Sequence, residues 1–426
     1  MLRIGYACLT VGEPLLNYRT LTQKYLTKDR LYGVISNNLA TLKRHIIYNF
    51  ERQILVFRIS SDLIPFGSSL LNSFPWADDF APQFQELKAL ISQTKMRISM
   101  HPGQYSVLNS PHERVVTATI RDLEYHQKVI ALLGGSSEHK IILHIGGIYG
   151  DKEAAVKRFI AQYKLLSVDI KKHLVIENDD HFYDLETVLG ISYETGAPVI
   201  FDLFHHQVLP SLEGVDLQTL FQLVRATWRP SDGRMKIHYS EPDLNKRGGA
   251  HSQTIEAVSF LKTFESFRHE DIDILLEVKD KNISAIKCHN LISTDQPIEP
   301  LEYAWSQYKY LVLEHDHQAY QAIRELLKHK SEYPVLAYYQ LVEKALHKKP
   351  TPGGMRNAAM HVWGYFKKVA TDREKKTFEQ YLQSIADNEG NNLKIKRFLR
   401  KLAFKYNQTY LIRSLYLYMT GFIEIK

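Results

Sequence analysis

The chain has 426 residues, of which 44% are hydrophobic and 24% charged, so it can bury one large core and a second, smaller one. Its two cysteines, Cys8 and Cys288, belong to no zinc-type spacing, and no stretch approaches the roughly 20 apolar residues of a membrane span. These features exclude a disulfide-rich secreted domain and an integral membrane protein, and the first residues resemble no signal peptide. We predict a soluble, cytoplasmic protein.

Short apolar runs alternate with amphipathic segments along roughly the first 280 residues. Eight such runs span residues 3–8, 54–60, 97–101, 141–146, 174–178, 199–202, 235–239 and 274–279. This alternation predicts βαβ units and a parallel sheet, and eight units over this length are typical of a (β/α)₈ TIM barrel. The competing fold is an open doubly wound sheet, which would normally have a Gly-rich loop after its first strand, and none follows residues 3–8.

The pattern changes beyond residue 285. Residues 286–300 contain Ser293, Thr294, Asp295, Pro297 and Pro300, a composition that suggests a linker. Residues 301–426 are helical in period, with one interruption, KKPTPGG, at 348–354. We therefore predict a barrel domain over 1–285, a linker over 286–300 and a smaller all-α domain over 301–426.

The positive charge lies in the predicted helical domain. Residues 301–426 hold 21 Lys+Arg against 12 Asp+Glu, whereas residues 1–300 hold 33 against 35. A basic compact domain is a candidate for binding the phosphate backbone of nucleic acid, and aromatic side chains among its lysines would stack on bases. The alternative is that the aromatics form the helical core and the lysines a solvated face. The residues concerned are Tyr308, Lys309, Tyr310, Trp363, Tyr365, Phe366, Lys367 and Lys368.

Ligand-type side chains gather where the predicted strands end, which is where TIM barrels hold their reacting groups. They are His101, His144, Glu177, Asp202, His205, His238, His251 and Glu277. A single histidine beside an apolar run is more often structural than functional, but carboxylates inside apolar runs are costly unless they are paired or bind a metal. Nitrogen and oxygen ligands without thiolates suit Zn²⁺, Mn²⁺ or Fe²⁺, and eight ligands need more than one ion. Such a site favours hydrolysis of phosphodiester bonds.

Several segments of the barrel domain resemble the UV damage endonuclease family, whose barrel is similar to those of endonuclease IV and xylose isomerase. The segments are RIGYAC (3–8), FRISSDLIPF (57–66), SMHPGQY (99–105), LHIGGIYGDK (143–152), IEND (176–179), FDLFHH (201–206), KIH (236–238), GGAH (248–251) and LLEVKDK (275–281). The resemblance implies an enzyme that nicks damaged double-stranded DNA 5′ of UV photoproducts, leaving a 3′-hydroxyl and a 5′-phosphate. It also implies two or three divalent ions, for which we expect Mn²⁺, with Zn²⁺ or Mg²⁺ as alternatives.

The resemblance also implies roles for single residues. The first ion would bind His101, His144 and Glu177; the second would bind Glu177, Asp202, His238 and Glu277; the third would bind His205 and His251. Lys236 matches a lysine that the family carboxylates as a further ligand, against the alternative of a strand-end lysine facing solvent. Glu177, Lys236 and Tyr6 would then be the catalytic residues.

Gln104 and Tyr105 match a pair that the family wedges into the duplex at the lesion. An aromatic ring and an amide on the tight Pro102–Gly103 loop suit that task, because the ring can stack where bases are pushed apart. Tyr6 matches a second DNA-contacting position, with a plug at the barrel floor as the alternative.

The chain departs from the family pattern at two places. It has Thr10 where the family commonly has Asn, and Ser68 and Ser69 where it commonly has a histidine that would be a candidate ligand beside His101. The second departure predicts weaker binding of one ion.

The C-terminal part resembles the YbgA-like helical domain, from which no catalytic role follows. We expect a monomer, with the helical domain as the place for a protein partner. Two alternative functions remain open: a sugar isomerase or epimerase of the xylose isomerase type, and a non-catalytic protein that binds damaged DNA.

Overall fold

The computed structural model describes residues 2–243, 246, 248–293, 296–387 and 392–425. The chain forms two compact units. The barrel unit comprises residues 1–9, 15–252 and 263–285, and the helical unit comprises residues 10–14, 253–262 and 286–426. Among the described residues, no helix combines the length and the apolar character that a membrane crossing requires.

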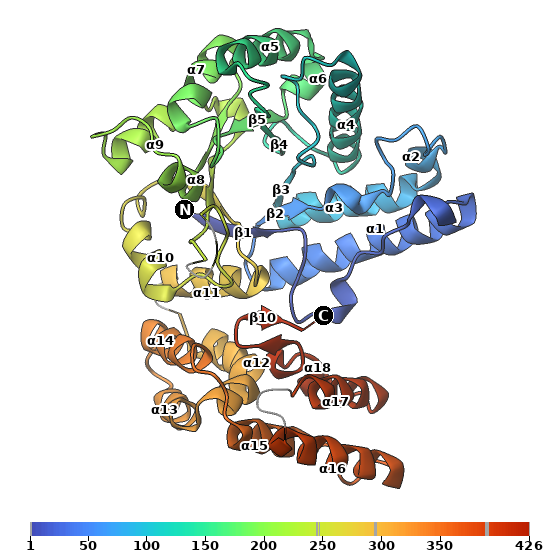
Figure 1. The fold of residues 1–426 in the computed structure, drawn as a ribbon, viewed down its shortest axis with the longest axis vertical. Coiled ribbons are helices and arrows are strands. Elements are labelled where there is room, and N and C mark those ends of the chain that lie inside the picture. Colours follow the sequence, from blue (N-terminus) through green and yellow to red (C-terminus); the bar gives the residue numbers. More distant parts are fainter. Residues whose placement is uncertain (1, 244–245, 247, 294–295, 388–391, 426) are drawn as a thin grey trace. The chain divides into compact units, whose positions relative to one another are not determined.

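The barrel unit is built on eight strands that close on themselves (Figure 1). They are β1 (Arg3–Ala7), β2 (Val56–Ile59), β3 (Arg97–Met100), β4 (Lys140–His144), β5 (Leu174–Glu177), β6 (Val199–Asp202), β7 (Met235–Tyr239) and β8 (Ile272–Leu276). Every neighbouring pair is parallel, and β8 pairs with β1 to complete the ring. This closed ring of eight parallel strands confirms the predicted TIM barrel. As in other barrels of this kind, all the carboxyl ends of the strands lie at one end.

Helices follow the strands. They are α1 (Lys28–Glu51), α2 (Trp76–Asp79), α3 (Ala81–Thr94), α4 (Glu113–Leu132), α5 (Lys152–Leu165), α6 (Val168–Lys171), α7 (Leu185–Thr195), α8 (Leu203–Val208), α9 (Leu217–Arg225), α10 (Ala257–Phe264) and α11 (Asn282–Ile292). Several begin at an Asp whose side chain accepts a backbone N–H of the first turn, as at Asp151, Asp184 and Asp216. Such N-caps fix where each helix leaves its loop.

The floor of the barrel is held by buried ion pairs. Asp273 accepts two hydrogen bonds from Arg3, at 2.7 and 2.8 Å, and one from Arg97 at 2.8 Å. Gly5, two residues after Arg3, has no room for a side chain, since a Cβ there would lie 2.0 Å from the Val56 carbonyl oxygen. These paired side chains fill the amino-terminal end of the barrel, and the candidate site lies at the carboxyl end.

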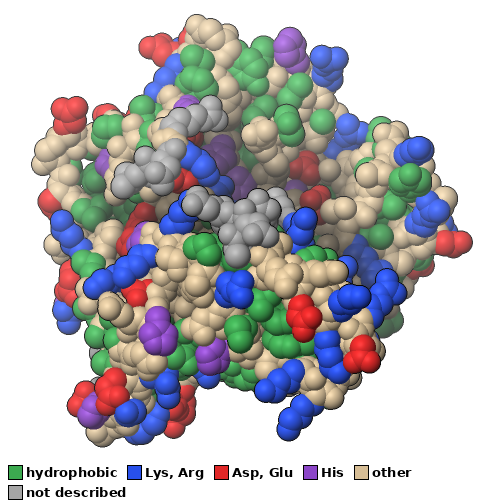
Figure 2. Space-filling model, turned by 60° about the horizontal axis from the view of Figure 1, so that its bottom comes forward, with side chains coloured by type: hydrophobic (Ala, Val, Ile, Leu, Met, Phe, Trp, Pro, Cys, Tyr) green, Lys and Arg blue, Asp and Glu red, His purple; other side chains and the backbone are tan. Residues whose placement is uncertain are grey.

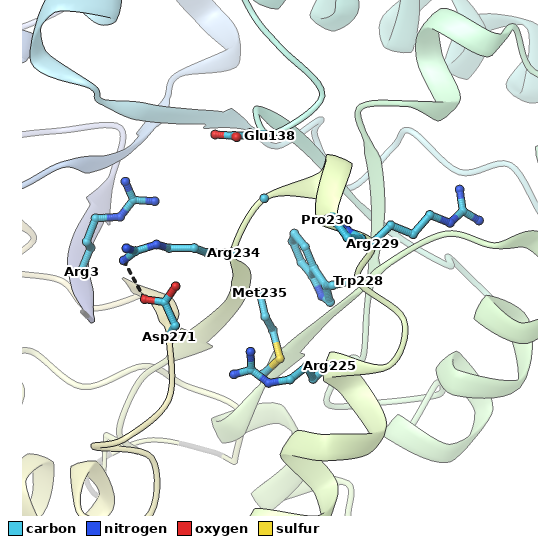
Figure 3. Close-up of a pocket in the computed structure, with 10 residues that line it drawn as sticks. Arg3, Glu138, Arg225, Trp228, Arg229, Pro230, Arg234, Met235 and Asp271 are labelled. Atoms are coloured by element: carbon cyan, nitrogen blue, oxygen red, sulfur yellow. Dashed lines mark ion pairs between the residues drawn. The ribbon is translucent and has the colours of Figure 1, made fainter.

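A surface cavity of about 500 Å³ opens at the amino-terminal end (Figure 3). Its lining includes Trp228, Glu138 and four arginines, of which Arg3, Arg225 and Arg234 pair with Asp273, Glu270 and Asp271. In Figure 3 the fourth, Arg229, points away from the others. Because most of its positive charge is already compensated, we assign this cavity no anion.

The predicted linker is corrected in part. Residues 286–292 belong to α11, so the first half of the segment predicted as a linker is helical, and residues 294 and 295 lie outside the described residues. The helical unit also takes up residues 10–14 and 253–262, so a single division at residue 285 is incomplete. Local composition could not show this, because unit membership depends on contacts distant in sequence.

The rest of the helical unit consists of α12 (Glu299–His315), α13 (His317–Leu326), α14 (Val335–Leu346), α15 (Pro352–Trp363), α16 (Asp372–Asp387), α17 (Leu393–Lys405), α18 (Thr409–Ile412) and a short hairpin of β9 (Met419–Thr420) and β10 (Ile423–Glu424). Tyr308, Tyr310 and Phe366 are buried in it. For these three aromatics the structure favours the core interpretation over base stacking.

Candidate metal centre

The carboxyl ends of β3 to β7 bring five of the predicted ligands together. Two groups of three have ligand atoms that lie within 4.8 Å of one another, and Glu177 belongs to both. The first group is His101, His144 and Glu177; the second is Glu177, Asp202 and His238. The strand register explains the proximity, because His144 pairs with Glu177 across β4 and β5, and Asp202 pairs with His238 across β6 and β7.

Glu177 is buried at the centre of these side chains. Its Oε1 lies 2.5 Å from His238 Nδ1, and its Oε2 lies 3.4 Å from His101 Nε2 and 3.5 Å from His144 Nε2. One carboxylate oxygen therefore faces each group. A carboxylate shared in this way is the arrangement that bridges two ions.

The three other predicted ligands lie around this core. Glu277 Oε1 is 3.3 Å from His238 Nδ1, and the His205 ring centroid is 6.1 Å from those of both His144 and His251. Within the described residues, neither His205 nor His251 joins a group of three ligand atoms as close as the two above. The structure thus brings a third set of ligands near the centre, without the close spacing of the first two.

Electrostatics at the centre favour a bound cation. Burial opposes the charge on Glu177, but the imidazoles of His238 and His144 hold its pKa well below the usual range. Burial raises the pKa of Asp202 to about 6, and repulsion from Glu177 and Glu277 adds to this effect. Despite burial, neighbouring carboxylates raise the pKa of His205 to about 9. The buried carboxylates of Glu177, Asp202 and Glu277 therefore repel one another, and a bound cation would relieve that repulsion.

Several buried side-chain atoms of these candidate ligands also have no hydrogen-bond partner within the described residues. They are Glu177 Oε2, Asp202 Oδ2, His144 Nδ1 and His238 Nε2. Unpaired buried polar atoms are costly, and native proteins rarely keep them without a reason such as a bound ion. The residues present therefore fit divalent metals on an observation independent of any family resemblance.

Lys236 lies two residues before His238 and is completely buried, so the alternative of a lysine facing solvent is wrong. Its amine has no hydrogen-bond partner among the residues described. Burial and the nearby guanidinium of Arg97 hold the pKa of Lys236 well below its usual range. Its surroundings therefore disfavour the charged form of this amine.

Tyr6 is the clearest failure of the sequence predictions. Its ring is completely buried, packs edge-on against Phe57 and donates a hydrogen bond of 2.8 Å from its hydroxyl to Asn49 of α1. Side chains alternate along a strand, and in β1 the even-numbered positions face the surrounding helices. The prediction that Tyr6 contacts DNA or the reacting atoms is wrong, and so is the alternative of a floor plug.

Gln104 and Tyr105 occupy the corner of a tight turn on the loop after β3. The Ser106 N–H donates to the Gly103 carbonyl at 2.9 Å, and the Tyr105 side chain is 83% exposed. The turn directly follows His101, a ligand of the first group. An exposed aromatic side chain therefore lies four residues after His101 in the chain, on a loop at the carboxyl end of the barrel.

Two supporting residues were missed by sequence reasoning. The Arg58 guanidinium donates to Glu277. The side-chain amide of buried Asn178 donates from Nδ2 to the Asp202 carbonyl at 3.0 Å and accepts at Oδ1 from the Asp202 N–H at 2.9 Å. The Asn178 carbonyl also bonds to His205 Nδ1 at 2.9 Å, which sets the orientation of that ring. The only signals were weak ones: Arg58 lies inside the apolar run FRIS, and Asn178 directly follows the run LVIE.

Comparison with known proteins identifies the family of this chain. A family model described as UV-endonuclease UvdE matches residues 2–309, and one described as a protein of unknown function (DUF1722) matches residues 309–420. A UV DNA damage endonuclease of Clostridium perfringens is 36% identical over 408 residues, which cover 95% of this chain and 96% of that protein. One from Bacillus cereus is 31% identical over 284 residues, covering 66% of this chain and 89% of that protein.

Among solved structures, the crystal structure of SacUVDE matches with a TM-score of 0.65 and 37% sequence identity. The match covers 71% of this chain and 99% of that one. With a matching family model over most of its length and a relative that spans nearly all of it, this chain belongs to the UV-endonuclease UvdE family.

Proposed function

We propose that this protein is a DNA repair endonuclease that uses divalent metals to hydrolyse the phosphodiester bond 5′ of UV photoproducts and related lesions. The observation that supports it most is the position of Glu177, whose two carboxylate oxygens face two separate groups of ligands. Figure 2 shows histidine and acidic side chains within a hollow on one face.

The chain's own residues would prepare the site for this chemistry. His101, His144, Glu177, Asp202, His238 and Glu277 would hold two ions, with His205 and His251 for a third. Bound ions of this kind activate water as a nucleophile and stabilise the negative charge of phosphodiester displacement. Asn178 orients His205, and Arg58 holds Glu277 in place. Gln104 and Tyr105 would fill the gap in the bent duplex.

The finer assignments are proposals of the same kind. Mn²⁺ is the ion we propose for the cell, with Zn²⁺ and Mg²⁺ as alternatives. We also propose that the buried, unpaired amine of Lys236 reacts with carbon dioxide to form a carbamate, with release of a proton, which would give a further oxygen ligand. A ¹³C resonance in the carbamate region that appears with labelled bicarbonate and is lost in Lys236→Met would support it, and an unmodified lysine at saturating bicarbonate would refute it.

We further propose a cytoplasmic monomer, consistent with the two free cysteines, whose basic helical unit contacts a phosphate backbone or a protein partner.

The direct test is incubation of a UV-irradiated, end-labelled duplex with the protein in Mn²⁺, Mg²⁺, Zn²⁺ or EDTA. We expect a nick on the 5′ side of the lesion that depends on metal, and a 3′-hydroxyl that a DNA polymerase can extend. Lesion binding without cleavage in any metal would favour the non-catalytic alternative. Ketose formation from an aldose without nicking would favour the sugar isomerase.

Replacing both Gln104 and Tyr105 with alanine is expected to abolish the preference for damaged DNA. The change removes the exposed turn but no metal ligand, so metal content should stay at the wild-type level. Competition between irradiated and unirradiated duplexes measures the preference directly. The matched control is Tyr193→Ala, which removes a tyrosine that is 90% exposed. Tyr193 lies near the end of α7, where the chain returns to the opposite end of the barrel. An unchanged preference in the double variant would place recognition elsewhere.

A further inference from the structure

The loop after β2 presents two adjacent leucines to solvent. Leu70 is 79% exposed and Leu71 is 43% exposed. They form the corner of a turn in which the Asn72 N–H donates to the Ser69 carbonyl at 3.1 Å and the Leu71 N–H donates to Ser69 Oγ at 3.2 Å. Turn corners usually hold Gly, Asn, Asp, Ser or Pro, so two leucines there are unusual.

This turn has the same construction as the turn that bears Gln104 and Tyr105. Each is closed by a hydrogen bond from the fourth residue to the first, Asn72 to Ser69 and Ser106 to Gly103, with its two middle side chains exposed. The two turns lie on consecutive βα loops. Since both loops follow the carboxyl ends of their strands, both belong to the end of the barrel that holds the candidate metal centre.

Helix α4 anchors the leucine loop. The Tyr125 hydroxyl donates to the Ser61 carbonyl at 2.7 Å and accepts from the Ile64 N–H at 3.2 Å. Gly67 packs so closely on the Tyr125 ring that a Cβ there would lie 2.2 Å from it. Asn72 Nδ2 donates to the Pro65 carbonyl at 3.1 Å and fixes the far side of the loop. The exposed leucines therefore lie on a loop that hydrogen bonds and packing against Tyr125 hold in place.

The same helix anchors the neighbouring turn. The Asp122 carboxylate accepts from Ser106 Oγ at 2.6 Å, at the end of the Gly103–Ser106 turn. The His126 ring bonds through Nε2 to Ser61 Oγ at 2.9 Å, and Ser61 Oγ donates to the His101 carbonyl at 2.7 Å. Ser61 thus links the two loops, and their contacts with α4 hold the two turns in place relative to one another.

We propose that Leu70 and Leu71 form a second, apolar contact with DNA, inserted against the bases beside the lesion while Gln104 and Tyr105 occupy the gap. This inference rests on the proposed function. Residues 59–77, which contain the loop, have no Lys or Arg, so the loop is unsuited to phosphates. Apolar side chains inserted at a base step support a kinked duplex and lose their contact with water.

The test is Leu70→Ser with Leu71→Ser, measured as the dissociation constant for an irradiated duplex over a range of salt. We expect affinity to fall by about tenfold to 100-fold, the effect of losing two leucines that are each about half buried on binding. The slope of log affinity against log salt should not change, because no phosphate contact is lost. Metal content should also stay the same. Leu70→Met with Leu71→Met should bind as the wild type does.

The matched control is Leu165→Ser, which removes a leucine that is 77% exposed at the end of α5, where the chain leads to the opposite end of the barrel. If the wild type nicks irradiated DNA and the double serine variant binds it equally well, this inference is overturned and the proposed function stands. If the wild type neither binds nor nicks the duplex, the proposed function fails and this inference fails with it. Unchanged DNA binding with a change in sedimentation would assign the leucines to contact between copies of the chain.

Discussion

Glu177→Gln is expected to reduce cleavage of irradiated DNA to background. Glu177 is the one residue shared by the two ligand groups, with Oε1 directed at His238 and Oε2 at His101 and His144. Glutamine has nearly the same shape but is neutral and replaces one ligand oxygen with an amide that donates. The loss of activity should exceed the roughly 10-fold to 100-fold that removal of an outer-shell partner typically costs.

The measurement pairs metal content by mass spectrometry with nicking at saturating Mn²⁺. Far-ultraviolet circular dichroism should show an intact barrel, because the substitution keeps the volume of the side chain. Glu138→Gln, at the amino-terminal end of the barrel, is the matched control and should keep both metal and activity. Persistence of both metal content and nicking in Glu177→Gln would show that the centre is wrongly assigned.

Lys396→Met is expected to destabilise the helical unit by about 3–5 kcal/mol, the usual cost of leaving one member of a buried ion pair alone. Lys396 and Glu314 are both inaccessible to solvent, with Nζ 2.5 Å from Glu314 Oε2 and 2.8 Å from the Met419 carbonyl. Burial raises the pKa of Glu314 and lowers that of Lys396, so each group depends on the other to stay charged. Without the lysine, the carboxylate must take up a proton or remain unpaired.

Hydrogen exchange of the α12 and α17 amides, followed by mass spectrometry, reports the stability of this unit separately from that of the barrel. Lys394→Met, at an exposed position on the same helix, should leave exchange nearly unchanged. The double variant Glu314→Gln with Lys396→Met should recover part of the loss, because no unpaired charge remains. Protection in Lys396→Met equal to the wild type would show that the pair contributes little.

The repeating pattern of apolar runs was sufficient to predict the barrel and the end at which its ligands meet. Parallel strands and short loops leave few topologies, and the strand ends of a closed barrel must converge. Five of the eight predicted ligands therefore lie in two tight groups. The motif around Gln104 and Tyr105 likewise indicated an exposed turn, since Pro102 and Gly103 favour a tight loop and Tyr105 is exposed there.

The facing of single side chains and the supporting contacts at the site depend on residues that are distant in sequence. Tyr6 was misassigned because the sequence does not show which side chains of β1 point into the barrel and which point outward. That depends on how β1 pairs with its neighbours, and in the structure the Tyr6 side chain points outward to Asn49 of α1. The supporting roles of Arg58 and Asn178 depend on partners that lie 219 and 24 residues away in sequence. The sequence by itself determined the class of fold and the kinds of atom that meet at the site, because hydrophobic period and ligand chemistry are local properties. Only the tertiary structure decided which way each side chain faces and which loops share the α4 anchor, because those depend on packing between elements that the chain order does not specify.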